Sequence, residues 1–383
     1  MDLFGEEEVI EKEETFEADE SFEEFFHHPR QMEHLLGHEN AQEELLNAFK
    51  CGRMPHGIIL NGVRGIGKAT LAYRFARFLL KNPPHNPNQN SMFDIEPVNL
   101  DQSSLHIDRA DPIFSRVASG GHPDLLTLER AYDATKNRTA ESLAVAELRK
   151  VEPFLRMTSS NGGWRVVIID DADTMNRNAQ NALLKILEEP PKNTIIMLIT
   201  HRLGALIPTI RSRTRLINID IITNDVMNEL LVKKGYSVDS NQLEIISAMA
   251  NGSFGQACDL IEQGGLESFA TITSILNDMP NIDWRLVHHH ADQCARAGQD
   301  QLYKNMSHTL IWIYKTLVFA KARGHALKPY SLNEAPLSTI LAKSSLAQLL
   351  KICENLTDHF EMTNRGNLDK KQAILGAFQI ISA

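Results

Sequence analysis

The chain contains, at residues 56–71, the stretch HGIILNGVRGIGKATL. An apolar run leads into a glycine-rich turn with Gly62, Gly65 and Gly67. Lys68 then opens a pattern of apolar residues at helical spacing. A strand, a loop and a helix in this order are the context in which G-x-x-x-x-G-K predicts a phosphate-binding loop. Such glycines let backbone N–H groups converge on a phosphate, and the start of the helix adds its dipole. The stretch therefore predicts a P-loop fold.

One position of this loop departs from the pattern of a working ATPase. Ala69 follows Lys68, where the motif places a Ser or Thr hydroxyl that binds Mg²⁺. Thr70 lies about 100° further round the helix and does not simply replace that hydroxyl. Arg64, inside the loop, either adds charge next to a phosphate or is solvated, and the sequence does not decide between the two. We expect ATP or ADP to bind only weakly here.

A second signal is a pair of apolar runs, at 164–169 and 194–199, that are typical of buried strands in a parallel sheet. The first run is followed by Asp170 and Asp171, and the second by Thr200. Because ligands bind at the carboxyl ends of parallel strands, we expect these side chains beside the loop. Asp170 is either a structural carboxylate or the remnant of a metal ligand. The predicted nucleotide-binding residues are Gly62, Arg64, Gly65, Gly67, Lys68, Ala69, Thr70, Asp170 and Thr200.

The pattern around these strands predicts an α/β core followed by helices. We expect a helix at 140–157 and short strands at 125–128 and 215–219. Beyond about residue 223 the alternation of strand and helix ends, and only helical patterns remain. An Asn- and Pro-rich stretch at 82–104 reads as an excursion or flexible loop. The fold class predicted is therefore a doubly wound parallel sheet flanked by helices, with helical domains after it.

Composition narrows the class of protein further. The chain has 383 residues, enough for two or three domains, and no apolar run near 18 residues, so we expect no membrane span. Its acidic start is unlike a signal or transit peptide. Four scattered cysteines without C-x-x-C spacing argue against a zinc site and against a disulfide framework. We expect a cytoplasmic protein without a metal site.

Most of the negative charge lies at the beginning of the chain. Residues 1–26 hold twelve acidic residues and one basic residue, Lys12, so that the net charge of −10 belongs almost wholly to this tail. High charge density without an apolar period predicts disorder there. The remainder is close to neutral, and a surface that faces nucleic acid is not excluded by the overall charge.

The ordered set of motifs resembles a known family. The set comprises Gly-Arg-x-Pro-His-Gly at 52–57, the loop, the Asp box, Leu-Glu-Glu-Pro-Pro at 187–191 and Ser212-Arg213. Together these resemble the AAA+ subunits of the bacterial DNA polymerase III clamp-loader family from about residue 30 to 383, most closely its delta-prime branch. After the disordered acidic tail, which we place at 1–28, the resemblance implies an AAA+ core at 29–220, a helical lid at 221–267 and a helical collar at 268–383.

The departures from the family's motor subunits all concern hydrolysis. Besides Ala69, the second acidic box places Asp171 where the motors have Glu to polarise the attacking water, and the lid has Gln256 where they present an arginine. The family's zinc module is absent or remodelled, because residues 80–122 contain no cysteine. Arg213 is retained. In the family this arginine reaches the ATP of a neighbouring subunit, so we predict a catalytic role in trans for Arg213 and a degenerate one for Asp171.

The resemblance implies a largely ATPase-deficient stator of the clamp loader. Its implied partners are gamma/tau and delta subunits in a hetero-oligomeric ring, the sliding clamp, and primed DNA through the complex. No polymerase site is expected in this chain. Three alternatives stay open: a motor subunit that hydrolyses ATP itself, another AAA+ remodeller of DNA such as a branch helicase, and a binding adaptor that uses no nucleotide.

Overall fold

The computed structural model describes residues 28–84, 104–133, 138–140, 142–159, 162–325, 327, 336–366 and 368–382. The predictions for the acidic tail 1–28, apart from His28, and for most of the segment 82–104 therefore lie outside the described residues. Within the described parts, every helix is too short or too polar to cross a membrane.

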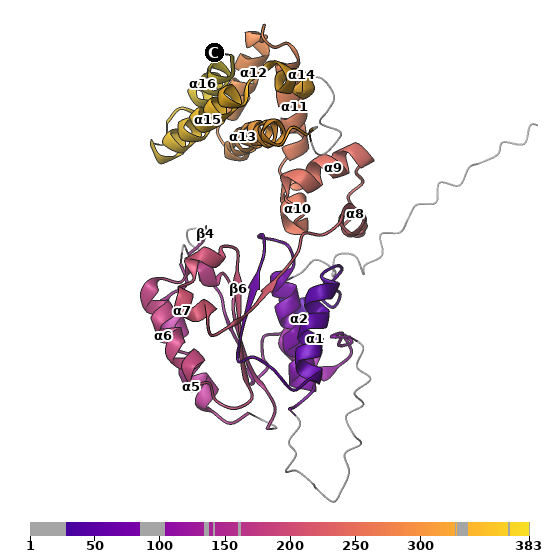
Figure 1. Ribbon diagram of the computed structural model, residues 1–383, viewed down its shortest axis with the longest axis vertical. Coiled ribbons are helices and arrows are strands. Elements are labelled where there is room, and N and C mark those ends of the chain that lie inside the picture. Colours follow the sequence, from indigo (N-terminus) through magenta and orange to yellow (C-terminus); the bar gives the residue numbers. More distant parts are fainter. Residues whose placement is uncertain are drawn as a thin grey trace, which may run out of the picture.

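A five-stranded parallel sheet forms the first part of the chain (Figure 1). The strand order is β2-β5-β6-β1-β7, so that β1 lies between β6 and β7, and Asn61 pairs with Thr200. The predicted strands of the core are confirmed with small shifts at their ends. The strands are β1 (Gly57–Asn61), β2 (Leu125–Leu128), β5 (Arg165–Ile169), β6 (Thr194–Thr200) and β7 (Arg215–Asn218); a separate antiparallel pair is β3 (Tyr132–Asp133) and β4 (Arg138–Thr139).

Helices cover both faces of the sheet. Successive side chains of β1 point to opposite faces, and those on both faces are apolar and need cover. Ile58 and Leu60 pack in the core with the helices α1 and α2, whereas Ile59 packs with α4 to α7. Figure 1 shows α1 and α2 on one side of β6 and α5, α6 and α7 on the other. The helices of this part are η2 (Pro29–Gln31), α1 (Glu39–Lys50), α2 (Lys68–Lys81), α3 (Pro112–Ala118), α4 (Val145–Leu148), α5 (Val151–Arg156), η3 (Ala172–Thr174), α6 (Arg177–Glu188), η4 (Leu203–Ala205) and α7 (Pro208–Arg211).

The single helix predicted at 140–157 was wrong. Two short helices, α4 and α5, occupy this stretch and are separated at Arg149 and Lys150. Pro153 explains the break: within a continuous helix its ring would clash with the carbonyl group of Arg149. Because the helix restarts at Val151, Pro153 lies in the first turn of α5, where a proline is tolerated.

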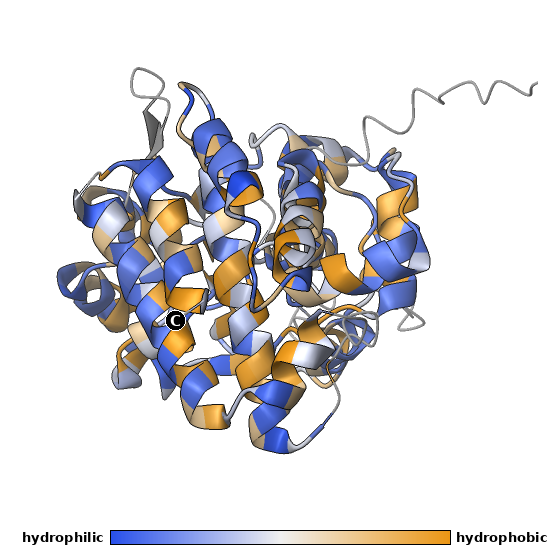
Figure 2. Ribbon diagram, turned by 90° about the horizontal axis from the view of Figure 1, so that it is seen from above, coloured by the Kyte–Doolittle hydropathy of each residue, from blue (hydrophilic) through white to orange (hydrophobic). Residues whose placement is uncertain are grey.

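Among the described residues that follow β7, all regular elements are helices, as predicted. Three of them, α8 (Asn224–Lys233), α9 (Ser240–Met249) and α10 (Phe254–Glu262), form a small group beside the carboxyl edge of the sheet, which we call the lid helices. The others surround a separate hydrophobic core, and Figure 2 shows that they carry hydrophobic and hydrophilic residues on the same helix, as helices packed on one face do. They are α11 (Gly265–Asn277), α12 (Trp284–Cys294), α13 (Asp300–Arg323), α14 (Leu337–Lys343), α15 (Leu346–Gly366) and α16 (Lys370–Ser382).

Candidate functional site

The glycine-rich loop connects β1 to α2, as the sequence predicted. Gly67 caps the helix with φ 109° and Gly65 has φ 75°, backbone conformations that side chains with a Cβ rarely adopt. A Cβ on Gly62 would come within 2.9 Å of the carbonyl oxygen of Ile219. These glycines let the chain turn tightly between the end of β1 and the start of α2, with Lys68 at the first helical position.

The ammonium group of Lys68 is bound within the chain. Its Nζ donates to the carbonyl oxygens of Gly62 at 2.8 Å and Val63 at 2.7 Å, and lies 2.8 Å from Nδ1 of His201. Lys68 is only 3 % exposed. The lysine of a P-loop normally directs its ammonium group to the β- and γ-phosphates. Here three partners from the protein itself occupy the three donors that an ammonium group has.

His201 links Lys68 to a carboxylate. Its Nε2 lies 2.6 Å from Oδ1 of Asp171, and Nε of Arg130 donates to the other oxygen of Asp171 at 2.6 Å. The partners assign the tautomer, because the lysine can only donate to Nδ1, which leaves Nε2 to donate to Asp171. Lys68, His201, Asp171 and Arg130 therefore form one hydrogen-bonded chain, which we call the internal charge network.

The electrostatics of the site follow from burial and from these contacts. Burial lowers the pKa of Lys68 to about 8, against the opposing effect of the nearby carboxylates. The hydrogen bond from His201, together with Arg130, lowers the pKa of Asp171 to about 2. Burial and the neighbouring charge of Asp171 raise the pKa of Asp170 instead. The two adjacent carboxylates thus differ: Asp171 is held ionised by partners, while the charged form of Asp170 is disfavoured.

A cavity of about 310 Å³ lies where the loop, the strand ends, the residues before α1 and the lid helices meet. Its lining also includes the apolar side chains of Ile222, just before α8, and Phe254, the first residue of α10. Its size is at the low end for a small-molecule site. Of the predicted residues, the cavity brings together Arg64, Gly65, Gly67, Lys68, Ala69, Thr70, Asp170 and Asp171.

Two of the predicted nucleotide-binding residues do not line this cavity. Gly62 lies at the base of the loop and donates its N–H to the carbonyl oxygen of Thr200 at 3.3 Å. The hydroxyl of Thr200 accepts the N–H of Arg202 at 3.1 Å, and the side chain is fully buried. Thr200 therefore closes a strand, and the next residue, His201, is the one that reaches the loop.

The start of α10 is bonded directly to the loop. The hydroxyl of Ser253 and the side-chain amide of Gln256 both donate to the carbonyl oxygen of Arg64, at 2.6 and 3.0 Å. The N–H of Gly255 donates to the carbonyl oxygen of Gly65 at 3.0 Å. The backbones meet so closely that a Cβ on Gly255 would lie 2.9 Å from Cα of Gly65. The uncharged side chain of Gln256 thus joins the loop to the start of α10 by a hydrogen bond.

Arg213 lies elsewhere, just beyond α7. Its guanidinium forms an ion pair with Glu188 at 3.0 Å and donates to the carbonyl oxygen of Thr209 at 3.3 Å. The side chains of Arg213 and Glu188 are 39 % and 49 % exposed. Exposed pairs of this kind contribute about 0–1 kcal/mol. The guanidinium is therefore accessible at the surface and only lightly held.

Sequence reasoning missed two members of the internal charge network, His201 and Arg130. Both follow strands of the sheet: His201 comes directly after β6, and Arg130 lies two residues beyond the end of β2. The rule that placed Asp170 and Thr200 at the carboxyl edge of the sheet applies equally to these positions. An extension of the prediction by one or two residues past each strand would have included them.

Comparison of the sequence with known proteins relates part of the chain to subunits of DNA polymerase III. Residues 37–223 match the family described as "DNA polymerase III, delta subunit". The chain is 34 % identical over 158 residues to the DNA polymerase III subunit delta' of Pseudomonas aeruginosa, covering 41 % of each protein. It is 30 % identical over 238 residues to the DNA polymerase III subunit gamma of Buchnera aphidicola, covering 61 % of this chain and 58 % of that one. The chain thus spans about half the length of these relatives.

Among solved structures, a DNA polymerase III gamma subunit-related protein from Thermotoga maritima covers 88 % of this chain and 98 % of its own. The identity is 16 % and the TM-score 0.33.

Proposed function

Since the chain belongs to the DNA polymerase III clamp-loader family, we propose that it is the delta-prime-type subunit, a stator with little ATPase activity of its own. In this role it helps a ring of gamma/tau and delta subunits to load a sliding clamp on primed DNA. It supplies Arg213 to a nucleotide that a neighbouring subunit binds. The single observation that carries the proposal is that the ammonium group of Lys68 is hydrogen-bonded to groups of this chain itself and not left free for a phosphate.

The internal charge network accounts for weak use of ATP by this chain. A phosphate that reached Lys68 would have to displace two carbonyl oxygens and His201. Ala69 provides no hydroxyl for Mg²⁺, and the carboxylate of Asp171 is bound to His201 and Arg130, so that it is not available to orient a water. Each missing catalytic group typically lowers a rate by about 10²–10³.

Arg213 has the properties that an arginine supplied in trans requires. It is exposed, it stays charged, and its pair with Glu188 is weak enough to be exchanged for a phosphate. An arginine that stabilises the transferring phosphoryl group from a neighbouring subunit is worth about 10³–10⁵ in rate. The role of the chain would then be catalytic for its neighbour and structural for itself.

The test is the ATPase activity of the complex reconstituted with its clamp-loader partners. Arg213→Ala should leave assembly intact and lower the hydrolysis at the served site by at least about 10³-fold. Arg215→Ala is the matched control, because Arg215 is also exposed and ion-paired, with Glu44 at 2.7 Å. Equal activity of the two variants would refute the role of Arg213.

A motor subunit is the second candidate, because a gamma subunit is among the relatives. The two candidates differ in what the chain does alone. A stator should show no ATPase activity above background without its partners, whereas a motor should hydrolyse ATP by itself. Substantial activity of the purified chain, abolished by Lys68→Ala, would favour the motor.

A further inference from the structure

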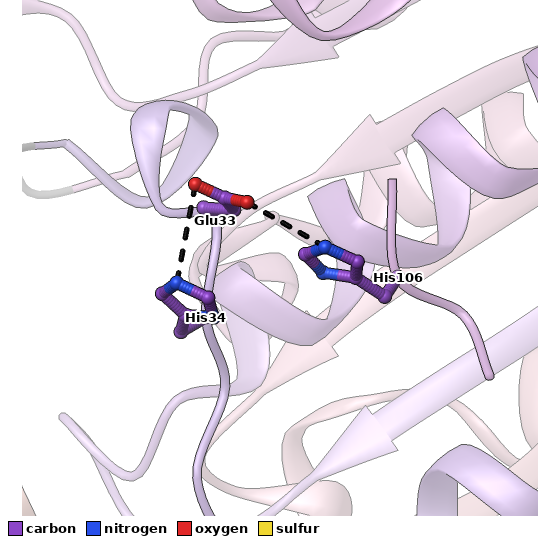
Figure 3. A group of neighbouring side chains, drawn as sticks. All are labelled: Glu33, His34 and His106. Atoms are coloured by element: carbon purple, nitrogen blue, oxygen red, sulfur yellow. Dashed lines mark ion pairs between the residues drawn. The ribbon is translucent and has the colours of Figure 1, made fainter. Parts of the chain in front are cut away.

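Three side chains with metal-binding atoms lie close together: Glu33, His34 and His106 (Figure 3). The first two belong to the segment between η2 and α1, and His106 belongs to the segment before α3. Nε2 of His106 lies 3.5 Å from one carboxylate oxygen of Glu33, and Nε2 of His34 lies 3.9 Å from the other. The two imidazole rings are parallel, with centroids 5.8 Å apart. One ligand atom from each residue lies within 4.8 Å of the others.

The fold holds the two segments that carry these residues. Leu105 and Ile107, on either side of His106, are buried, so that in an extended segment His106 points the opposite way, toward Glu33. On the other segment, Arg74 of α2 donates to the carbonyl oxygen of Glu33 at 2.7 Å. This bond fixes the backbone of Glu33 without using its carboxylate.

We propose that Glu33, His34 and His106 form a binding site for a divalent metal ion of the Zn²⁺ class. Two imidazoles and one carboxylate are a ligand set that Zn²⁺ takes in proteins, with bonds of about 2.0–2.2 Å. Such bonds in tetrahedral geometry place ligand atoms about 3.3 Å apart. The two distances from the carboxylate oxygens to the imidazole nitrogens, 3.5 and 3.9 Å, are slightly longer, so the ion would draw the three side chains together. A fourth position would remain for water.

The second group of metal-binding side chains among the described residues is a poorer candidate. It consists of Asp171, Asp173 and His201. Asp171 and His201 already bind one another, and the cations Lys68 and Arg130 are bonded to them. A metal ion would have to displace these contacts and approach two positive charges. The group at Glu33 lies outside the internal charge network; Arg74 is a cation close to it, and its guanidinium donates to the carbonyl oxygen of Glu33.

A metal ion in this site would join the segment around His106 to the segment that precedes α1. His34 also lines the cavity beside the phosphate loop. The ion would therefore tether one wall of that cavity. The donors differ from cysteine-based zinc modules, which is why the scattered cysteines of this chain gave no signal for the site.

The experiment measures Zn²⁺ binding to the full chain, stripped of metal, by competition with a chromophoric chelator. The expected result is one Zn²⁺ per chain with a dissociation constant on the order of micromolar or below, and a higher melting temperature with Zn²⁺ present. His34→Ala and His106→Ala should each weaken binding at least about tenfold. Glu33→Gln, which keeps the shape of the side chain, should weaken it similarly.

The matched control is the double variant His289→Ala/His290→Ala, which removes another adjacent pair of imidazoles. It should bind Zn²⁺ like the parent chain. Equal affinity of the parent and the His34 and His106 variants would overturn the proposal, as would loss of binding in the control alone. Co²⁺ substitution gives a separate readout: nitrogen and oxygen ligands give no thiolate charge-transfer band, and the appearance of that band would overturn the site.

Discussion

The phosphate loop and the surface around Arg213 each hold a cation, and the two cations differ in their burial and in the number of their partners. Lys68 is buried, and its ammonium group is bound to two carbonyl oxygens and to His201. Arg213 is exposed and has one carboxylate partner, itself half exposed. Both are cations that phosphates can attract. Only Arg213 is free to exchange its partner at low free-energy cost.

This difference separates the fold of an ATPase from its activity. A buried cation that already has partners stabilises the loop in one conformation, and each partner must be lost before a ligand can replace it. A surface cation in a weak pair loses little when it moves to a phosphate. Under the proposed function, the same chain would retain a P-loop as a structural element and contribute catalytic charge to another subunit.

The largest expected effect concerns the contact that holds the loop to the lid. A methyl group on Gly255 would press against backbone atoms of Gly65, at 2.9 Å from Cα and 3.1 Å from the carbonyl oxygen. Because the obstacle is backbone, Gly255→Ala should lower the free energy of unfolding by about 2–3 kcal/mol. Chemical denaturation measures this change.

Gly204→Ala provides the control for that substitution. A Cβ on Gly204 meets no atom within 4 Å, and its φ is not in the left-handed region. Alanine in a helix is normally more stable than glycine by about 0.5–1 kcal/mol. Stabilisation by Gly255→Ala, of the kind that helix propensity alone predicts, would show that the loop and the lid are not in close contact.

The next effect, of about 2 kcal/mol, tests the internal charge network. Asp171 has φ 48°, a conformation that Asn also tolerates, so Asp171→Asn removes the charge without straining the backbone. Partners lower the pKa of Asp171 from 3.8 to about 2. The ionised carboxylate therefore stabilises the native state by about 2 kcal/mol, and the variant should lose this amount at neutral pH.

The pH dependence gives this prediction its sign. A carboxyl group with a lowered native pKa stabilises the fold above its unfolded pKa of 3.8, and this stabilisation is lost as the pH falls toward 2. The difference between parent and variant should therefore be constant near neutrality and shrink in acid. Asp170→Asn is the control, because the pKa of Asp170 is raised and its charge does not stabilise the fold. Similar losses from both variants would argue against a specific network.

The fold could be predicted largely from apolar runs and turn residues. The strands β1, β5 and β6 are almost wholly buried, and such strands show as continuous apolar stretches in the sequence. The helix at 140–157 was mispredicted because its apolar spacing persisted across a break that Pro153 imposes. The apolar spacing favours one continuous helix, but the ring of Pro153 is incompatible with it.

The site was predicted only in part, because its contacts join segments far apart in the chain. The loop and the acidic pair were found, since each has a local pattern. The bonds among Lys68, His201 and Arg130 depend on where side chains point after a strand ends, and no apolar period fixes that direction. Glu33 and His106 meet for the same reason, through the folded arrangement of two segments that carry no motif.

The smallest expected effect on stability concerns the exposed ion pair between Arg213 and Glu188. Glu188 is the last residue of α6 and half exposed, so Glu188→Gln should change the free energy of unfolding by less than about 1 kcal/mol. The ATPase activity of the reconstituted complex should stay within about twofold of the parent, because Arg213 keeps its charge and its bond to Thr209. If Glu188→Gln lowered the ATPase activity as strongly as Arg213→Ala, Glu188 would be needed to orient the guanidinium. Both residues of the pair would then belong to the neighbour's site. Arg213 would be held by a required partner, as Lys68 is, and the two cations would no longer differ in this respect.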